Sequence, residues 1–384
     1  MRVVDGDVAH ASADRMLAER VALEVVRIRE LGALLTSSEV VEGLGPSVSA
    51  ALAQLVTQQA TAYEGLSTTG VTVTSWERLH QRVRTSDQVL AECLAVIAGA
   101  RARPLPRVAA ACEEAEAVAR ELYQLTQIAP GHGVIPADAE CVSALSSVVR
   151  RRYPDHGLWD LPVIAHEFGH LVTRDLLEID PVSGDDSRPL ADLLAGSKRQ
   201  TAELASDVFA ILTMGPAYAE NLVLHRMNPL AAAVSAHDAT HPGDSSRVAA
   251  VLYALGLLGA SYSAAKTKQY DFLQEGLADW WVSAQHGVDP EARLDDAGAA
   301  RVRLEVDKIW RVLKKSKLWA GRYQSYDRAR ALADDFRRHG IAGAESSCRN
   351  VLNAAWLIRF RAWREGATEP VGVTSWAAAQ IVPG

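Results

Sequence analysis

The stretch "LPVIAHEFGHLV" at residues 161–172 places two histidines four positions apart, with a glutamate directly after the first. Asp160 is suited to cap a helix N-terminus, and Pro162 is tolerated only in a first helical turn. With about 3.6 residues per turn, one side of this helix carries Leu161, Ile164, Phe168, Leu171 and Val172. His166 and His170 fall on the other side, one turn apart. The stretch therefore predicts a helix with one apolar face and one face that carries chemistry.

The spacing of the two histidines suits a metal ion. Imidazoles at positions i and i+4 can both reach one zinc ion at about 2.0–2.1 Å. Glu167 lies too far round the helix to be a comfortable third ligand, but it can reach a water molecule beside the metal. Gly169 costs about 1 kcal/mol relative to alanine inside a helix, so we expect another segment to pack closely there. The alternative interpretation is two hydrogen-bonded histidines on a buried helix.

A catalytic zinc site needs a third protein ligand and an open coordination position. Two stretches supply a glutamate followed by an aspartate one helical turn later. "TAELASDVFA" contains Glu203 and Asp207, and "QEGLADWW" contains Glu275 and Asp279. The glutamate can bind the metal while the aspartate accepts the outer N–H of a ligand histidine and so sets its tautomer. Spacing alone does not separate the two pairs.

The stretch H-E-F-G-H followed by A-E-L-A-S-D-V-F resembles the gluzincin zinc metallopeptidases. The thermolysin-like branch carries Asn-Glu-x-x-Ser-Asp-x-Phe on its third-ligand helix, and this chain has Ala202 where that branch has Asn. The stretch "THPGDSSR", residues 240–247, is similar to the His-Pro-x-x-x-x-Arg element of the CAAX-prenyl-peptidase-like gluzincins. The order of the three elements is the same, which favours Glu203 over Glu275. All the matched residues lie between residues 160 and 250.

This resemblance implies a zinc-dependent peptidase with a zincin-like core, acting on a peptide or protein substrate. His166, His170 and Glu203 would hold the Zn²⁺ ion, and Asp207 would orient a ligand histidine. Glu167 would act as the general base that takes a proton from water and passes it to the leaving amine.

The same resemblance suggests roles for two further residues. The family's His-Pro element places its histidine over the metal, so His241 is the expected donor to the oxyanion. His237, four residues earlier, is the other candidate, and a surface histidine is its alternative interpretation. Arg247 is expected either to anchor the next helix or to bind a carboxylate of the substrate.

The composition, 48% hydrophobic and 23% charged, is that of a folded globular protein. The cysteines are widely separated, without a C-x-x-C pair, which is typical of reduced thiols in a cytosolic protein: they are Cys93, Cys112, Cys141 and Cys348. The first residues include acids where a signal peptide needs a basic end. The longest uncharged stretch, residues 248–265, contains serine, glycine and tyrosine, which favours a core helix over a membrane span. We therefore expect a cytoplasmic protein without membrane segments.

The net charge of −7 conceals a basic segment. Residues 301–364 hold 16 Lys or Arg against 6 Asp or Glu. A basic block can bind nucleic acid or an acidic partner, but these charges alternate at helical spacing with Trp, Leu and Phe. We expect a solvated helix face rather than a nucleic-acid site. A protein partner could dock on these helices or on the N-terminal ones.

Most of the chain shows helical periodicity. The expected early helices cover residues 12–35, residues 46–62 from a first-turn proline, a helix from the capping box at 74–77 to about residue 98, and one that ends at Leu125. "GVTVT", residues 70–74, is the one clear alternating strand. Residues 126–138, rich in proline and glycine, are the expected linker.

The predicted protein is predominantly α, with three regions. An N-terminal helical region covers residues 1–130, a zinc metallopeptidase core covers 131–290, and a basic C-terminal helical extension covers 291–384.

Two other functions remain open. Glu-x-x-His also marks di-iron helix bundles, which need it on two helices together with two further glutamates. "ERLH", with Glu77 and His80, is a second copy, but a di-iron site would leave His166 and Asp207 without a role. The third interpretation is a helical interaction protein that keeps the metal site without turnover, although the motif residues show no sign of decay.

Overall fold

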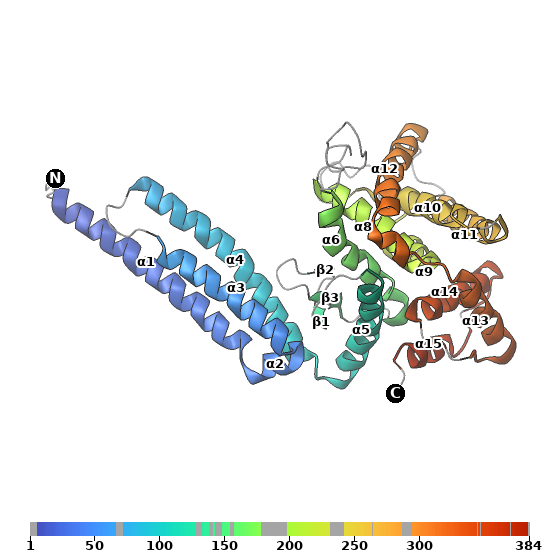
Figure 1. Ribbon diagram of the computed structural model, residues 1–384, viewed down its shortest axis with the longest axis horizontal. Coiled ribbons are helices and arrows are strands. Elements are labelled where there is room, and N and C mark those ends of the chain that lie inside the picture. Colours follow the sequence, from blue (N-terminus) through green and yellow to red (C-terminus); the bar gives the residue numbers. More distant parts are fainter. Residues whose placement is uncertain are drawn as a thin grey trace. The chain divides into compact units, whose positions relative to one another are not determined.

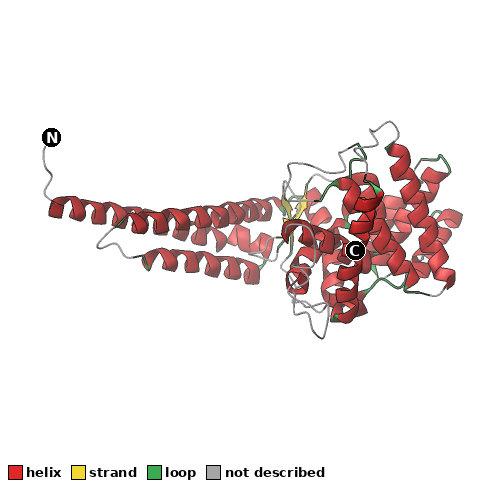
Figure 2. Cartoon of the chain, turned by 90° about the horizontal axis from the view of Figure 1, so that it is seen from above, coloured by secondary structure: helices red, strands yellow, loops and turns green. Residues whose placement is uncertain are grey.

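The computed structural model of the protein describes residues 6–66, 72–126, 133–137, 141–142, 148–153, 157–177, 198–230, 242–262, 264–285, 294–343, 345, 347–368 and 370–382. Within these residues the chain is predominantly helical, and the strands are few and short (Figure 2). The predicted α class is confirmed.

The contacts within the chain divide it into two compact units. Unit 1 comprises residues 1–112 and 131–153, and unit 2 comprises residues 113–130 and 154–384. One division falls at 130/131, where a boundary is predicted, and the others fall at 112/113 and 153/154. Residues 131–153 belong with unit 1 because β1 (Val134–Ala137) packs on α4 (Val73–Ala102). No unit boundary falls near residue 290 because α12 (Asp296–Lys315) packs on α10 (Asp244–Ala260) and α8 (Lys198–Met214).

Unit 1 is built on long helices. Its helices are α1 (Gly6–Leu35), α2 (Ser38–Leu44), α3 (Pro46–Glu64) and α4, and it includes the first turns of α5 (Pro106–Thr126). Helices α1, α3 and α4 lie side by side (Figure 1) and share one apolar core. The end of α1 at Leu35 and the start of α3 at Pro46 agree with the sequence prediction. Proline suits this first turn because its missing N–H would have no partner there.

The start of α4 corrects two predictions. The predicted strand at residues 70–74 is wrong in its described part, because Val73 and Thr74 belong to α4. Thr72 is the N-cap, and it forms a capping box with Ser75. Two β-branched residues beside a cap therefore mimicked strand alternation, and the helix begins before the capping box predicted at 74–77.

A small sheet completes unit 1. It contains β1, β2 (Cys141–Val142) and β3 (Val149–Arg152) in the order β1-β3-β2, with β3 parallel to β1 and antiparallel to β2. The predicted linker at 126–138 is therefore wrong over β1. Pro136 is compatible with this strand because β1 is at an edge of the sheet, where proline is tolerated.

Unit 2 is an assembly of helices. Its elements after α5 are η1 (Gly157–Asp160), α6 (Val163–Leu177), α8, α9 (Pro216–Asn221), the π-helical turn η2 (Leu222–Arg226), α10, α11 (Ala264–Ala284), α12, η4 (Lys317–Gly321), α13 (Tyr326–His339), α14 (Cys348–Arg364) and α15 (Val373–Ile381). Helix α8 is central, because α6, α10 and α12 all pack against it. From Leu204 to Met214 every side chain of α8 is buried. Polar groups on this helix therefore need partners inside the protein.

Among the described residues, no single helix is both long enough and apolar enough to cross a membrane. The pair α2 and α3 passes such a test only when taken together, and it is bent by 118°. Most of the uncharged stretch at 248–265 forms α10, whose Val251, Leu255 and Leu258 are fully buried.

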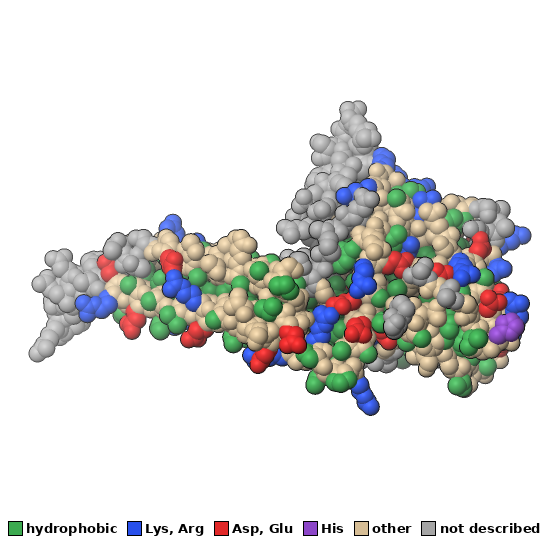
Figure 3. Space-filling model, turned by 60° about the horizontal axis from the view of Figure 1, so that its bottom comes forward, with side chains coloured by type: hydrophobic (Ala, Val, Ile, Leu, Met, Phe, Trp, Pro, Cys, Tyr) green, Lys and Arg blue, Asp and Glu red, His purple; other side chains and the backbone are tan. Residues whose placement is uncertain are grey.

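The basic segment at 301–364 uses many of its arginines inside unit 2. Arg349 Nε lies 2.9 Å from Glu121 Oε1, and Arg361 Nη1 lies 2.7 Å from Asp334 Oδ1. The guanidinium of Arg359 stacks on Trp159 and on Trp363, at 4.3 and 4.2 Å from the ring centroids. Basic and acidic side chains are interspersed on the face shown in Figure 3. These arginines therefore contribute to the packing of unit 2 itself.

Three cysteines in the described part, Cys93, Cys112 and Cys348, are buried thiols, as the composition predicts. Burial raises the pKa of Cys93 to about 11 and the pKa of Cys348 to about 12. Both side chains are therefore protonated and unreactive at neutral pH.

Candidate metal centre

Helix α6 is largely buried from Val163 to Val172, the part whose side chains the structure describes. Its predicted apolar face is inside, with Leu161 and Phe168 fully buried. The opposite face is buried too, since His166 is 6% exposed and Glu167 is 8% exposed. The chemistry-bearing face therefore meets other protein segments and is not simply open to solvent.

The start of α6 differs from the prediction. Asp160 lies in the preceding turn η1, and α6 begins at Val163. The Asp160 carboxylate accepts a hydrogen bond from Asn221 Nδ2 at 3.4 Å, and the same amide donates to the carbonyl of Trp159 at 2.7 Å. Asp160 therefore links the entrance of α6 to α9.

Gly169 allows α6 and α8 to approach closely. A Cβ atom placed on Gly169 would lie 2.8 Å from Ser206 Cα and 2.9 Å from Ser206 Cβ. Real side chains do not come that close to a neighbouring backbone, so any other residue would push the helices apart. The predicted close packing at Gly169 is confirmed. It brings His166 and His170 next to Glu203.

The three predicted ligands form a tight cluster. The Nε2 atoms of His166 and His170 lie 3.2 Å apart. The Glu203 carboxylate lies 3.3 Å from His166 Nε2 and 3.5 Å from His170 Nε2. Zinc–ligand bonds of about 2.0–2.1 Å in a tetrahedron separate the ligand atoms by about 3.3 Å. The separations therefore fit a tetrahedral zinc ion, and this is the group among the described residues that could hold a metal.

The competing acidic pair lies elsewhere. Glu275 and Asp279 are exposed on α11 and do not belong to the cluster. The side chain of Glu203 is only 14% exposed, and Asp207 is fully buried. Of the two pairs with equal spacing, the structure brings the α8 pair to the histidines.

Asp207 contacts the ring nitrogen of His166 that does not face the other two ligands. Its Oδ1 atom lies 2.8 Å from His166 Nδ1. A hydrogen on Nδ1 directed at this carboxylate leaves Nε2 facing His170 and Glu203. This is the orienting role that the sequence predicts for Asp207.

Arg247 anchors Asp207. Its Nε atom donates to Oδ2 at 2.8 Å, and Nη2 donates to Oδ1 at 2.6 Å. This two-point contact ties α10 to α8. The geometry therefore supports the anchoring of a helix, one of the two roles expected for Arg247.

The sequence analysis did not identify two residues that contact the ligand histidines. Ser206 Oγ lies 3.2 Å from His170 Nδ1. Tyr218 donates its hydroxyl hydrogen to Asp207 Oδ1 at 2.5 Å, and its oxygen lies 3.1 Å from His166 Nδ1. Ser206 could have been found, because it directly precedes Asp207 within the matched motif. Tyr218 could not, since it comes from α9, beyond the helix break at Gly215, and no spacing rule links it to α8.

The surroundings shift the pKa values of the two histidines in opposite directions. Burial lowers the pKa of His166, but the Asp207 carboxylate outweighs this and raises the pKa to about 9. Burial and the charge of His166 lower the pKa of His170 to about 4. Burial opposes ionisation of Asp207, yet Arg247 and His166 bring its pKa well below the ordinary value, and His166 likewise lowers the pKa of Glu203. In the absence of a metal, His166 therefore carries a proton that a metal ion must displace.

Glu167 is buried beside the ligands without being one of the three. Its charge is among the groups that raise the pKa of Tyr218, after burial and Asp207. Glu167 thus lies within electrostatic reach of the same cluster.

The histidines of the His-Pro element, His237 and His241, lie outside the described residues, and their roles stay predictions. The described part of this element begins at Pro242. Gly243 precedes α10 as its N-cap residue, and Asp244 Oδ2 accepts the backbone N–H of Asn228 at 2.8 Å.

The second Glu-x-x-His copy does not join a metal cluster. Glu77 and His80 are exposed on α4, in unit 1. Among the described residues, neither belongs to a group that could hold a metal. The geometry therefore does not favour the di-iron interpretation.

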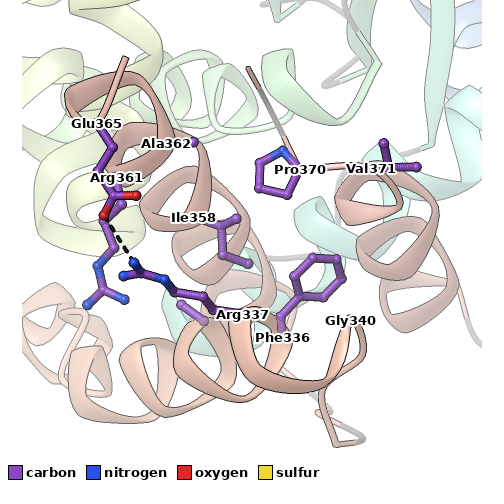
Figure 4. Close-up of a pocket in the computed structure, with 10 residues that line it drawn as sticks. Phe336, Arg337, Gly340, Ile358, Arg361, Ala362, Glu365, Pro370 and Val371 are labelled. Carbon is purple, nitrogen blue, oxygen red and sulfur yellow. Dashed lines mark hydrogen bonds and ion pairs between the residues drawn. The ribbon is translucent and has the colours of Figure 1, made fainter. Parts of the chain in front are cut away.

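Unit 2 also contains a pocket of about 270 Å³ between α13, α14 and the residues before α15 (Figure 4). Its apolar lining comprises Ala333, Phe336, Ile358, Ala362, Pro370 and Val371. Arg337 Nη2 donates to Glu365 at 3.2 Å on one side of it, and the other lining arginine, Arg361, is paired with Asp334. No residue of the candidate metal centre lines this pocket.

No protein-family model, curated protein or solved structure matches the chain. The resemblance to the gluzincins rests on the motif residues and remains a prediction.

Proposed function

We propose that this protein is a zinc-dependent peptidase of the gluzincin type. The observation that supports it most is the cluster of His166, His170 and Glu203, whose ligand atoms are separated by 3.2 to 3.5 Å. Two imidazoles and one glutamate are a donor set used by catalytic zinc sites that leave a fourth position open. The buried Glu167 directly beside His166 supplies the base that hydrolysis needs.

The proposed roles follow from this arrangement. Zinc bound by these three side chains would lower the pKa of a water molecule to about 7 and polarise a carbonyl group. Glu167 takes a proton from the attacking water and delivers it to the leaving amine. Asp207 keeps the Nδ1 hydrogen of His166 in place, so that Nε2 stays directed at the ligand cluster. Ser206 gives His170 a weaker, uncharged partner.

The first test is metal content. We expect one zinc per chain, removable by chelators, and loss of most of it in His166→Ala or His170→Ala. Metal analysis of the purified native protein and both variants measures this. Two irons per chain, or unchanged metal in both variants, would contradict the proposal.

The second test separates metal binding from hydrolysis. Glu167→Gln removes the base but no ligand, so zinc should remain while peptide cleavage stops. The comparison of new protein N-termini in cells expressing the native protein or Glu167→Gln reveals both activity and substrate. If the native protein holds zinc but generates no new termini, the protein is a metal-binding interaction protein without turnover.

The His-Pro element provides a third test. His241→Ala should keep zinc and fold but lose roughly 10²–10³-fold in kcat, the usual cost of one oxyanion donor. His237→Ala should be mild. The opposite result would reassign the donor to His237 and leave the proposed metal ligands untouched.

A further inference from the structure

Tyr218 lies on a short helix that is attached to other elements at both ends. All residues of its short helix, α9, are buried. At the start of α9, the Ala217 N–H donates to Asn353 Oδ1 at 2.9 Å, which attaches the helix to α14. At its end, Asn221 Nδ2 donates to the Trp159 carbonyl at 2.7 Å, which attaches it to the entrance of α6. The backbone that carries Tyr218 is therefore held at both ends.

The side chain of Tyr218 lies beside His166, near the ring nitrogen that does not face the ligand cluster. It is 1% exposed, and its ring is nearly parallel to that of His166, at 9° and with the centroids 6.1 Å apart. Its hydroxyl donates to Asp207 Oδ1 at 2.5 Å. The hydroxyl thus binds the same carboxylate oxygen that faces His166 Nδ1 at 2.8 Å.

Asp207 is held from three directions. Arg247 from α10 donates to both of its oxygens, Tyr218 from α9 donates to Oδ1, and His166 from α6 faces Oδ1 as well. A carboxylate bound only by the guanidinium could still pivot about that contact. The tyrosine hydroxyl supplies a second direction, and this restricts the angle that Oδ1 presents to the imidazole.

We propose that Tyr218 is a positioning residue of the metal centre. By holding Asp207 Oδ1 against His166 Nδ1, it keeps His166 Nε2 directed at the ligand cluster and increases the affinity for zinc. The inference rests on the metal site of the proposed function and does not depend on peptide hydrolysis. Tyr218 acts on the ligands through Asp207, and its oxygen also lies 3.1 Å from His166 Nδ1, the ring nitrogen that does not face the ligand cluster.

Tyr218→Phe tests this role, because it removes the hydroxyl and keeps the ring. We expect about a 10-fold weaker zinc affinity, within the range of about 10–100-fold that partners of metal ligands usually contribute. Competition with a chromophoric zinc chelator measures the affinity. The visible absorption of the cobalt(II)-loaded protein should also change, since it reports the geometry of the ligands.

Tyr323→Phe is the matched control. Tyr323 is also 1% exposed in unit 2, and its hydroxyl donates to Asn350 Oδ1 at 3.1 Å, away from the ligand cluster. Both variants lose one buried hydrogen bond, so both should lose some thermal stability. Only Tyr218→Phe should change the zinc affinity and the cobalt spectrum.

A double-mutant cycle with Asp207→Asn identifies the route of the effect. If Tyr218 acts through Asp207, Tyr218→Phe should weaken zinc binding less than about twofold in the Asp207→Asn background. A full additional loss in the double variant would overturn the inference, and so would native zinc affinity in Tyr218→Phe. A native protein that binds no zinc would overturn the proposed function together with this inference. A normal native affinity with an unaffected Tyr218→Phe overturns the inference alone.

Discussion

Two acidic pairs with the same spacing differ in almost every other respect. Asp207 on α8 is fully buried and the side chain of Glu203 is 14% exposed, whereas Glu275 and Asp279 on α11 are exposed. Helix α8 packs against α6, α10 and α12, so its acidic side chains meet the histidines of α6 and an arginine of α10. A spacing of four places two side chains on one helix face. The packing of the helix then determines whether that face is exposed to water or contacts the other residues of a site.

The consequence of burial is that the α8 pair needs partners. A buried carboxylate is stable only when it is paired and hydrogen-bonded, and Asp207 has Arg247, His166 and Tyr218. Water solvates an exposed pair, which needs no such partners. A change in the α8 pair therefore affects more neighbouring residues than a change in the α11 pair.

The largest expected difference is in metal content. Glu203→Ala should lower zinc from one per chain to nearly none, and its affinity should fall by more than the roughly 100-fold that an indirect partner can contribute. Glu275→Ala should keep one zinc per chain. Metal analysis after dialysis against dilute zinc measures both. The reverse result would move the site to α11.

Asp207→Ala and Asp279→Ala should differ strongly in stability. Removing Asp207 leaves Arg247, whose side chain is 12% exposed, without its two-point partner. Breaking a buried pair costs about 3–5 kcal/mol of unfolding free energy. Asp279→Ala should stay within about 0.5 kcal/mol, as is usual for surface positions. Urea unfolding of the metal-free proteins measures the difference, and equal losses would mean that burial does not distinguish the pairs.

A smaller difference is expected between two glycines: Gly169, which lies against Ser206 on α8, and Gly276, which follows Glu275 on α11. A Cβ on Gly169 would meet the Ser206 backbone, and a Cβ on Gly276 would lie 2.7 Å from Phe360 Cζ. Overpacking of this kind costs about 1–3 kcal/mol, so Gly169→Ala and Gly276→Ala should both lower stability. Only Gly169→Ala should also weaken zinc binding, because it separates α6 from α8. Zinc titration and thermal unfolding of both variants test this, and intact affinity in Gly169→Ala would contradict it.

The smallest expected effect is on the pH dependence of the metal-free protein. The pKa of His170 is lowered from 6.5 to about 4, so its contribution to stability is lost as the pH falls from 6.5 to 4. The pKa of His166 is raised from 6.5 to about 9, so its contribution is lost as the pH rises from 6.5 to 9. These two histidines together therefore favour a stability maximum near pH 6.5.

Urea unfolding in chelator across this pH range measures the profile. His170→Asn should flatten its acid side, because that group no longer has to take up a proton on unfolding. The double variant Glu275→Gln/Asp279→Asn serves as the control and should keep the native profile. An unchanged acid side in His170→Asn would show that His170 is not buried in its neutral form.

Much of the local structure could be predicted from residues close together in the sequence. The start of α3 at Pro46 and the end of α1 at Leu35 follow from short-range steric and hydrogen-bonding rules. The two faces of α6 follow from helical periodicity. The close approach at Gly169 follows from the cost of a glycine inside a helix. The errors at Val73 and in the predicted linker show where these rules stop, since residues 134–137 form a strand only because β3 pairs with them.

The sequence by itself determined the helical class and the presentation of His166, Glu167 and His170 on one helix, because both depend on periods of a few residues. Spacing left Glu203 and Glu275 equal and motif order favoured Glu203, but only the tertiary structure brought Glu203 to the histidines and Tyr218 to Asp207. Spacing along one helix is the same for any helix with that pattern. Which helices meet depends on how all the apolar faces are buried together, and that is a property of the whole packed unit.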